Sequence, residues 1–481
     1  MLSKQNSVWV WVTAGLFLVL NTIFIAMEWY FFALLPLVLF VVWSAFMRLD
    51  WLMLFIVACV PLSINLEQMD LGGIGFYLPT EPLLFGVMVL FIFKLLSGKS
   101  IDKRILTHPV SYVIYFYLVW MALTSITSEY PLISLKYLLT RMWFIAGFYF
   151  ILAHIFKDKK NIQKYFLLYL FPLFIVIIYT VVRHAGYGFD KEAGHWVMEP
   201  FYKDHTSYGA VLAMYFPVAV GLLLKRNMNP LLRTFLILGF VILTVGLVLS
   251  YTRAAWLSVA AVSGLLAVML LKVKLRTLIL VLVGLVSFVW VAQEQLIISL
   301  ERNDQDSSDD LAEHVESSLN VSSDASNLER LNRWNSALAM FEERPVFGWG
   351  PGTYQFVYAP FQKSQDLTII STNNADGGNA HSEYLGPLSE QGIPGTLVVL
   401  ILLLVVSNVA FRLTYTLESY ELKLLVLSAY LGLMTYFVHG VLNNYLDTDK
   451  ASAPFWGFIA VLVAIDVFHG QKAQDQFPEH V

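Results

Sequence analysis

The sequence predicts an all-α fold, a polytopic transmembrane helical bundle with about 12–14 spans. Hydrophobic residues make up 58% of the 481 residues and charged residues only 14%, whereas about 25% of a soluble domain is charged. Apolar runs of a length that crosses a bilayer as a helix recur along the whole chain. A polar segment before the last apolar runs predicts a large extracytoplasmic loop with short amphipathic helices.

Charge and cysteine content narrow the class further. The net charge of −4 gives no basic surface for nucleic acid, so no nucleic-acid partner is expected. The single cysteine, Cys59, lies in an apolar run, which excludes an intrachain disulfide and argues against a cysteine-based metal site. The first apolar run begins near Val8 with only Lys4 before it, so we expect a membrane span there and not a cleavable signal peptide.

Fourteen apolar stretches are expected to span the membrane. They lie near 8–27, 28–47, 50–64, 81–98, 109–127, 135–156, 164–183, 205–224, 232–250, 253–271, 276–295, 394–411, 422–441 and 452–469. The third stretch is short and the first two are poorly separated, so a smaller number is the alternative. The chain is thus expected to divide into N-terminal transmembrane helices (1–295), an extracytoplasmic loop (296–393) and C-terminal transmembrane helices (394–481).

Most of the 31 Lys and Arg residues lie in short loops that would all face one side of the membrane. These residues are Lys4, Arg48, Lys94, Lys99, Lys103, Arg104, Lys157, Lys159, Lys160, Lys164, Lys225, Arg226, Arg233, Lys272, Lys274, Arg276, Arg412, Lys423 and Lys472. The positive-inside rule predicts that this side is cytoplasmic. Both termini are then cytoplasmic, and the 296–393 segment is outside.

Other cations are expected near the opposite, outer helix ends, among them Arg141, Arg253 and Arg330. The positive-inside rule gives no reason to place a cation there, so each needs an acidic partner or an anionic ligand. Snorkelling or ordinary ion pairing is the alternative for any single one of them.

A short amphipathic helix is predicted over 326–344 in the outer segment. Apolar residues recur there at helical spacing, and Pro345 ends the run. Arg333 follows Glu329 by four residues, the favourable order for a simple helix ion pair. Arg330 borders the apolar stripe and has no obvious acidic neighbour along the helix.

The stretch 379–395 places a histidine, two carboxylates and a tyrosine directly before a long apolar run. Gly392 is expected to end a short polar helix, and Pro394 suits the first turn of the next one. Glu383 and Glu390 are seven residues apart, so they share a face if the helix is continuous. We therefore expect these polar side chains to lie just above the lipid.

Four motifs resemble the bacterial O-antigen ligase and polymerase superfamily. They are Ser250-Tyr-Thr-Arg-Ala-Ala-Trp256, Arg330-Leu-x-x-Trp334, Arg344-Pro-Val-Phe-Gly-Trp-Gly-Pro-Gly352 and His381-Ser-x-Tyr-Leu-x-x-x-x-Glu390-x-Gly-x-x-Gly395. Their order, spacing and position before the last spans match that family. The chain departs from the commoner family pattern by extra N-terminal helices and by Ser382, where Asn is frequent.

The resemblance implies transfer of a glycan from a polyprenyl (undecaprenyl) diphosphate to an acceptor hydroxyl, at the periplasmic face of the bacterial inner membrane. Such a reaction needs a base for the hydroxyl proton and cations for the diphosphate. His381 is the expected base, with a purely structural histidine as the alternative, and Glu390 is expected to orient it or to pair with an arginine. Arg253, Arg330 and Arg141 are expected to bind the diphosphate, because a guanidinium matches phosphate geometry. No cofactor and no divalent metal are expected.

Candidate contacts to the sugar or the acceptor are Glu383, Tyr384 and His439. A plain surface carboxylate explains Glu383 equally well, and packing is favoured for Tyr384. His439 is followed by Asn443, Asn444, Asp447 and Lys450, for which helix capping and loop solvation are equally good explanations.

Several functions within and outside this superfamily stay open. The expected partners are a lipid-linked oligosaccharide, membrane lipids and an acceptor that is a glycan, lipid A-core or a protein. An O-antigen ligase-like enzyme of lipopolysaccharide biosynthesis is the leading interpretation, while a polymerase or a protein O-oligosaccharyltransferase shares the donor chemistry. A transporter or flippase would need ionisable residues buried mid-helix and paired unwound segments, whereas the charges here lie mainly at helix ends. A structural scaffold would leave His381, Arg253 and Arg330 unexplained.

Overall fold

The computed structural model describes residues 4–66, 76–98, 101–281, 283–284, 287, 325–364, 367, 371 and 378–470. The chain divides into two compact units, Met1–Phe55 and Ile56–Val481. The first unit contains α1 (Lys4–Ala26), the short 3₁₀ helix η1 (Tyr30–Leu34) and α2 (Leu35–Met47). Aromatic rings join α1 to η1, with the Phe24 and Phe32 centroids 4.5 Å apart. The helix α3 (Leu49–Cys59) begins in this unit and continues into the second.

The described residues contain nine helices that are long and apolar enough to cross a membrane. They are α6 (Pro109–Ile126), the continuous run α7 (Pro131–Phe144), η4 (Ile145–Ile151) and α8 (Leu152–Ile155), α9 (Lys159–Ala185), α10 (His205–Leu223), α11 (Pro230–Leu249), α12 (Arg253–Leu270), α17 (Leu385–Thr416), α18 (Tyr420–His439) and α19 (Asp449–Phe468). Together with the near absence of strands in this part of the chain, they confirm an all-α, multi-pass membrane protein.

The remaining expected spans correspond to shorter helices or fall outside the description. Three shorter apolar helices cover Trp11–Ala26, Phe32–Met47 and Leu49–Leu62, and α4 (Thr80–Leu96) covers the expected span near 81–98. The 3₁₀ turn η2 (Val60–Leu62) extends α3, and the four-residue α5 (Lys103–Leu106) precedes α6. The expected span at 276–295 lies mostly outside the described residues.

Short polar residues start several of the long helices. Asp158 accepts a hydrogen bond from the amide of Lys160 at the start of α9 (3.0 Å), and Asp204 accepts two from the first turn of α10 (2.8 Å each). Asn229 accepts one hydrogen bond, from the amide of Leu231 at the start of α11 (2.9 Å). These side chains satisfy backbone N–H groups that a helix terminus leaves unpaired, and they fix where each span begins.

The helix α19 lies at the centre of the second unit. Most of its span is buried, and tyrosines of α9 pack on it. Tyr165 donates a hydrogen bond to the carbonyl of Ala453 (2.9 Å), and Tyr169 donates one to the carbonyl of Lys450 (2.8 Å). The polar start of α19 is thereby held at a fixed position against the surrounding helices.

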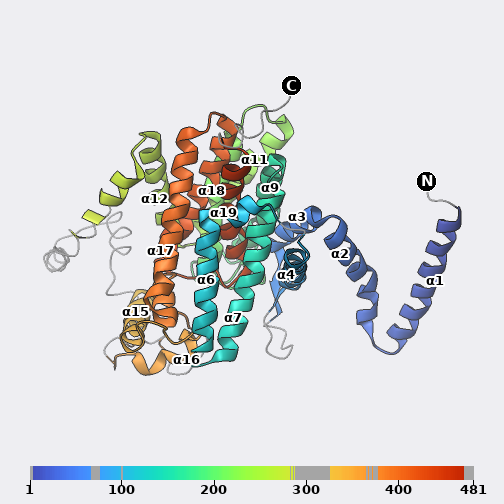
Figure 1. Cartoon of the computed structure of the whole chain (residues 1–481), viewed down its shortest axis with the longest axis horizontal. Helices are drawn as coiled ribbons and strands as arrows, with labels where there is room; N and C mark the ends of the chain where they lie inside the picture. The colour runs from blue at the N-terminus through green and yellow to red at the C-terminus, as the bar shows by residue number, and fades with distance from the viewer. Residues whose placement is uncertain are drawn as a thin grey trace. The chain divides into compact units, whose positions relative to one another are not determined.

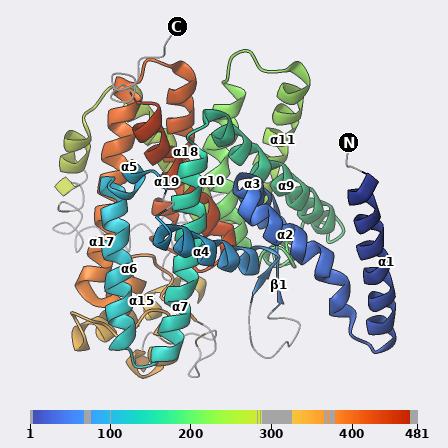
Figure 2. The same cartoon turned by 45° about the vertical axis from the view of Figure 1, so that its right-hand side comes forward.

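The helices α15 (Ala325–Glu343) and α16 (Tyr354–Val357) lie at the end of the bundle where α6 ends and α7 begins (Figures 1 and 2). The other short elements are the 3₁₀ turns η5 (Ala193–His195) and η6 (Ala359–Phe361) and the antiparallel strands β1 (Ile64–Asn65) and β2 (Tyr77–Leu78). The helix α15 confirms the amphipathic helix expected over 326–344. The glycine-rich segment 347–352 packs on α17, where the amides of Trp349 and Gly350 donate to the carbonyls of Ser389 (3.1 Å) and Glu390 (2.8 Å).

The helix α17 is interrupted at Gly392, as the sequence predicts. Gly392 has φ 67° and ψ −166°, a conformation that essentially only glycine adopts. A Cβ at this position would also lie 2.2 Å from the carbonyl oxygen of Val346. Glycine is therefore required here for two reasons, and Pro394 follows in the first turn of the apolar helix.

Candidate active site

A polar cavity of about 470 Å³ opens among the short elements at this end of the bundle. This is the size of a pocket for a small molecule or part of a larger one. Its lining comes from several segments that are far apart in the sequence. The lining residues are Tyr77, Tyr137, Tyr202, Lys203, Asp204, Ser207, Gly352, Tyr354, Gln355, Gly378, Asn379, His381, Glu390, Asn444, Tyr445, Asp447, Thr448 and Lys450. Tyrosines, amides and charged groups dominate this list, which suits a ligand rich in hydroxyl groups.

His381 lines the polar cavity from the turn before α17. Its backbone lies in the left-handed region (φ 47°), which is uncommon for a residue other than glycine, and its amide donates to Asn379 Oδ1 (3.0 Å). Burial, and then the nearby Arg333 and Arg330, lower the pKa of His381 to about 4, although a hydrogen bond with Asn443 opposes them. The imidazole is therefore neutral at pH 7 and has a lone pair that can accept a proton.

A narrower pocket of about 70 Å³ adjoins the polar cavity. The two share Tyr137, Tyr354, Asn379, Glu390 and Asn444. The rest of the narrow pocket is mainly apolar, with Val113, Ile114 and Tyr117 from α6, Val398, Val399 and Leu402 from α17, and Phe437, Phe455 and Trp456 from α18 and α19. The two cavities together have one polar and one apolar end.

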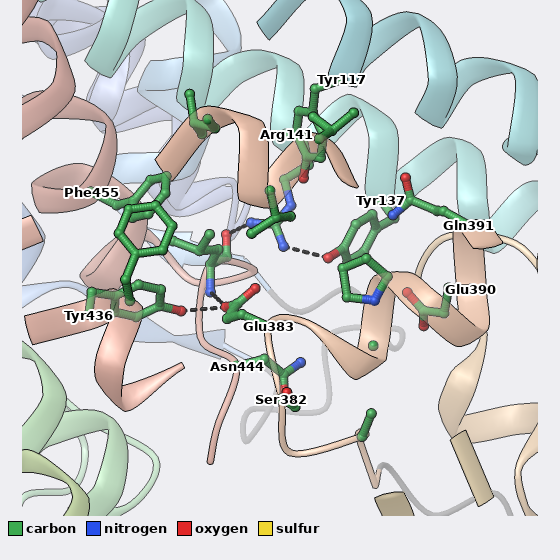
Figure 3. Close-up of a pocket in the computed structure, with 18 of the residues that line it drawn as sticks. Tyr117, Tyr137, Arg141, Ser382, Glu383, Glu390, Gln391, Tyr436, Asn444 and Phe455 are labelled. Atoms are coloured by element: carbon green, nitrogen blue, oxygen red, sulfur yellow. Dashed lines mark hydrogen bonds between the residues drawn. The ribbon is translucent and has the colours of Figure 1, made fainter. Parts of the chain in front are cut away.

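Arg141 of α7 lies in the narrow pocket, between Tyr137 on one side and Glu383 and Tyr436 on the other (Figure 3). It is 3% exposed and donates to the hydroxyl of Tyr137 and the carbonyl of Leu446. Among the described residues, no carboxylate lies within 4.0 Å of its guanidinium, and its Nε has no hydrogen-bond partner. Glu383 and Asp447 interact with it electrostatically but form no direct ion pair with it. A buried cation that no carboxylate contacts directly is costly, so this site is suited to an anionic ligand.

Glu383 is a linking residue in the structure and not a surface carboxylate. Its Oε1 accepts hydrogen bonds from the hydroxyl of Tyr436 and from the amides of Tyr445 (3.0 Å) and Leu446 (3.2 Å). Burial raises the pKa of Glu383. The carboxyl group thus connects the turn that carries His381 to the loop between α18 and α19.

Tyr384 strengthens the same connection by a hydrogen bond. Its hydroxyl donates to the carbonyl of Phe437 (2.8 Å), and the amide of the preceding Glu383 donates to the carbonyl of Gly440 (2.7 Å). These bonds fix the turn beside the end of α18.

Glu390 is buried beneath the glycine-rich segment. Its Oε1 accepts a hydrogen bond from the amide of Tyr354 (2.9 Å), and its carbonyl accepts one from Gly350. No ion pair between Glu390 and an arginine occurs within 4.0 Å in the part of the chain that the structure describes. The expected pairing is therefore not formed, and Glu390 holds a wall of both cavities in place.

Arg253 and Arg330 lie near the start of α10. Arg253 is the first residue of α12, and the preceding Thr252 donates a hydrogen bond to the carbonyl of His205 (2.9 Å). Arg330 on α15 interacts electrostatically with both His205 and His381. Neither arginine lines the two cavities described above, so of the three predicted arginines the structure brings Arg141 into them.

The ion pair that the spacing of Glu329 and Arg333 predicts is formed, and it is buried. Arg333 Nε lies 2.8 Å from Glu329 Oε1, and the two side chains are only 8% and 7% exposed. Arg333 also donates to the carbonyl of Asn379 (3.4 Å), two residues before His381. The expected pair is therefore formed, and it fastens α15 to the turn that carries His381.

The lining of the polar cavity lacks the predicted His439 and includes residues that were not predicted. His439 is 1% exposed and lines neither cavity. It packs behind Tyr445, which lines the polar cavity, with the two ring centroids 5.8 Å apart. Sequence reasoning missed Lys203, Asp204 and Tyr77, which the loop before α10 and the strand β2 supply. The polar run before the apolar residues of α10 was a signal for Asp204, whereas the two-residue strand gave none.

The fold and the cavities define a multi-pass membrane protein with a polar site at one end of its bundle. Residues 238–400, about a third of the chain, match the family model described as O-antigen ligase. No curated protein matches the chain. The match supports the resemblance carried by the motifs, and the matched region contains Arg253, Arg330, Glu390 and His381. It supports a membrane enzyme that transfers glycans.

Proposed function

We propose that the protein transfers a glycan from polyprenyl (undecaprenyl) diphosphate to an acceptor hydroxyl, as an O-antigen ligase-like enzyme. The observation that carries the proposal is the junction of two cavities, one apolar with the buried cation Arg141, the other polar with the neutral base His381. A lipid-linked glycan has the same sequence of parts: an isoprenoid chain, an anionic diphosphate and a hydroxyl-rich sugar.

In the proposed reaction, the isoprenoid chain lies toward the apolar residues of α6 and α17. Arg141 binds the diphosphate. Arg253 and Arg330, which lie near the start of α10, also bind it. The acceptor oxygen attacks the anomeric carbon, the bond from that carbon to the phosphate oxygen breaks, and polyprenyl diphosphate leaves. His381 takes the acceptor proton, and the arginines neutralise the charge on the leaving group.

The proposal places the site on the extracytoplasmic side, where the catalytic loop 296–393 supplies His381 and meets residues of the N-terminal helices (1–295) and the C-terminal helices (394–481). The acceptor is proposed to be lipid A-core, with a growing glycan or a protein as the alternatives within the same chemistry. Among the described residues there is no group of three His, Cys, Asp or Glu side chains that could hold a metal ion. We therefore propose that arginines, in place of a divalent cation, neutralise the charge of the diphosphate.

Reconstitution with a lipid-linked oligosaccharide tests the proposal. The purified protein in lipid vesicles is given the donor with lipid A-core, a free glycan or a protein substrate, each with and without EDTA. Glycosylation of lipid A-core that EDTA leaves unchanged is the expected result. Transfer to another acceptor would reassign the enzyme within the superfamily. Movement of the donor across the bilayer without transfer would favour a flippase.

A further inference from the structure

A second cavity of about 220 Å³ lies between α9, α10 and α18, at their ends remote from His381. Asp204 and Ser207 at the start of α10 line the polar cavity, whereas Leu222 and Lys225 at its other end line this one. With 19 residues in α10 and a rise of 1.5 Å per residue, the two sites are about 28 Å apart. That separation is close to the hydrocarbon thickness of a bilayer.

The lining of this cavity carries a net positive charge. Lys159 and Lys160 come from the first turn of α9, and Lys225 follows α10. Glu421 is the only carboxylate in the lining, and it lies 3.8 Å from Lys225 Nζ, which also donates to Gln163 (2.9 Å). In the described part of the chain, Lys159 and Lys160 have no carboxylate within 4.0 Å. Their ammonium groups therefore remain available for an anion.

The other side of the cavity is apolar. Its remaining lining includes Leu222, Leu422, Leu424 and Leu425. The leucine side chains do not stabilise a bound soluble anion. A molecule with a charged head and a hydrocarbon chain, in contrast, buries its chain against them. The cavity thus combines both halves of a lipid-binding site.

We propose that this cavity binds an anionic phospholipid, with its phosphate on the three lysines and an acyl chain against the leucines. Basic pockets between transmembrane helices at the cytoplasmic side are suited to anionic head groups. The distribution of Lys and Arg predicts that this end of the bundle is the cytoplasmic one. The inference does not depend on the proposed glycan transfer, because it concerns the opposite end of the molecule.

Lipid retention measured by native mass spectrometry tests the site. The protein is reconstituted in mixed vesicles of phosphatidylglycerol and phosphatidylcholine, and the bound lipids are counted. We expect wild type to retain phosphatidylglycerol preferentially. The triple variant Lys159→Gln, Lys160→Gln, Lys225→Gln should lose this preference by about fivefold per lysine removed. Lys160→Gln alone alters one exposed side chain, so it should fold normally and show about a fivefold loss.

A matched control removes the same charge from the same end of the bundle without altering the cavity. The variant Lys94→Gln, Lys103→Gln, Lys272→Gln should retain phosphatidylglycerol like wild type. An equal loss in this control would overturn the proposal in favour of general surface charge. Competition by inorganic phosphate at the same concentration as the lipid would also overturn it, because the ligand would then be a soluble anion.

Discussion

The protonation state of His381 links its surroundings to the rate of the proposed reaction. Its pKa is lowered to about 4, and only the neutral form accepts a proton from the acceptor. Activity should therefore be present at neutral pH and lost as the pH falls through about 4. The pH dependence of kcat/KM reports the free enzyme, so its acidic limb should lie well below the ordinary histidine value of about 6.5. An acidic limb near 6.5 would show that His381 does not control the rate or is not buried as described.

The bound donor should change the pKa of His381. Two phosphate groups beside the imidazole favour its protonated form and raise its pKa. The acidic limb of kcat, which reports the complex with substrate, should therefore lie at higher pH than the limb of kcat/KM. Both profiles are available from initial rates measured at several donor concentrations.

The three arginines are distinguished from ordinary cations by the geometry that a guanidinium offers to phosphate. Arg141→Lys, Arg253→Lys and Arg330→Lys keep the charge but lose the paired donors. Each should reduce transfer about 10- to 100-fold, since a hydrogen bond to a charged group contributes about 1.5–3 kcal/mol. The measurement is the initial rate at matched amounts of folded protein.

Arg412→Lys is the matched control for the arginine series. Arg412 pairs with Asp466 at the opposite end of the bundle and is 43% exposed, so lysine there should leave the rate unchanged. Wild-type rates in all three test variants would show that the diphosphate lies elsewhere.

At the scale of elements, the packing of α15 against the rest of the protein depends on the buried ion pair between Glu329 and Arg333. Glu329→Ala leaves Arg333 buried without its partner, which should cost about 3–5 kcal/mol of unfolding free energy. Glu129→Ala removes the partner of Arg344 from an exposed pair (37% and 47%), which should cost about 1 kcal/mol or less. Denaturant unfolding in detergent compares the two. Equal losses would mean that the Glu329–Arg333 pair is accessible to water.

The sequence predicted the long helices well, because each needs only a run of apolar residues and a polar cap. The break in α17 was also predictable, since Gly392 and Pro394 act locally. The burial of the Arg333–Glu329 pair was not, because it depends on Asn379, which lies 46 residues further along the chain. The spacing of four residues predicts the pair but says nothing about what covers it.

The candidate site shows the same limit. His381 and the arginines were predictable from motifs, but the partners of Glu383 were not, because the hydroxyl of Tyr436 comes from a residue 53 positions away. The strands β1 and β2 have two residues each, too few to show the alternation that predicts a strand. Contacts between distant segments therefore decide which polar residue lines the cavity and which one supports it.

At the scale of the whole molecule, the proposed reaction requires the 296–393 segment to face outward. A cysteine replacing Ser318 in a Cys59→Ser background should react with an impermeant thiol reagent in intact cells after permeabilisation of the outer membrane. A cysteine replacing Ser97, at the end of α4, should react only after the inner membrane is lysed. The reverse labelling pattern would invert the orientation inferred from the lysines and arginines.

The most direct test of the account is the rate of glycan transfer by His381→Ala in the reconstituted system. His154→Ala is its matched control, because His154 is an exposed histidine at the other end of the bundle. A general base contributes about 10²–10⁴-fold, so we predict a loss of that size for His381→Ala, with normal folding and insertion, and none for His154→Ala. Near-normal transfer by folded His381→Ala protein would contradict the assignment of His381 as the base.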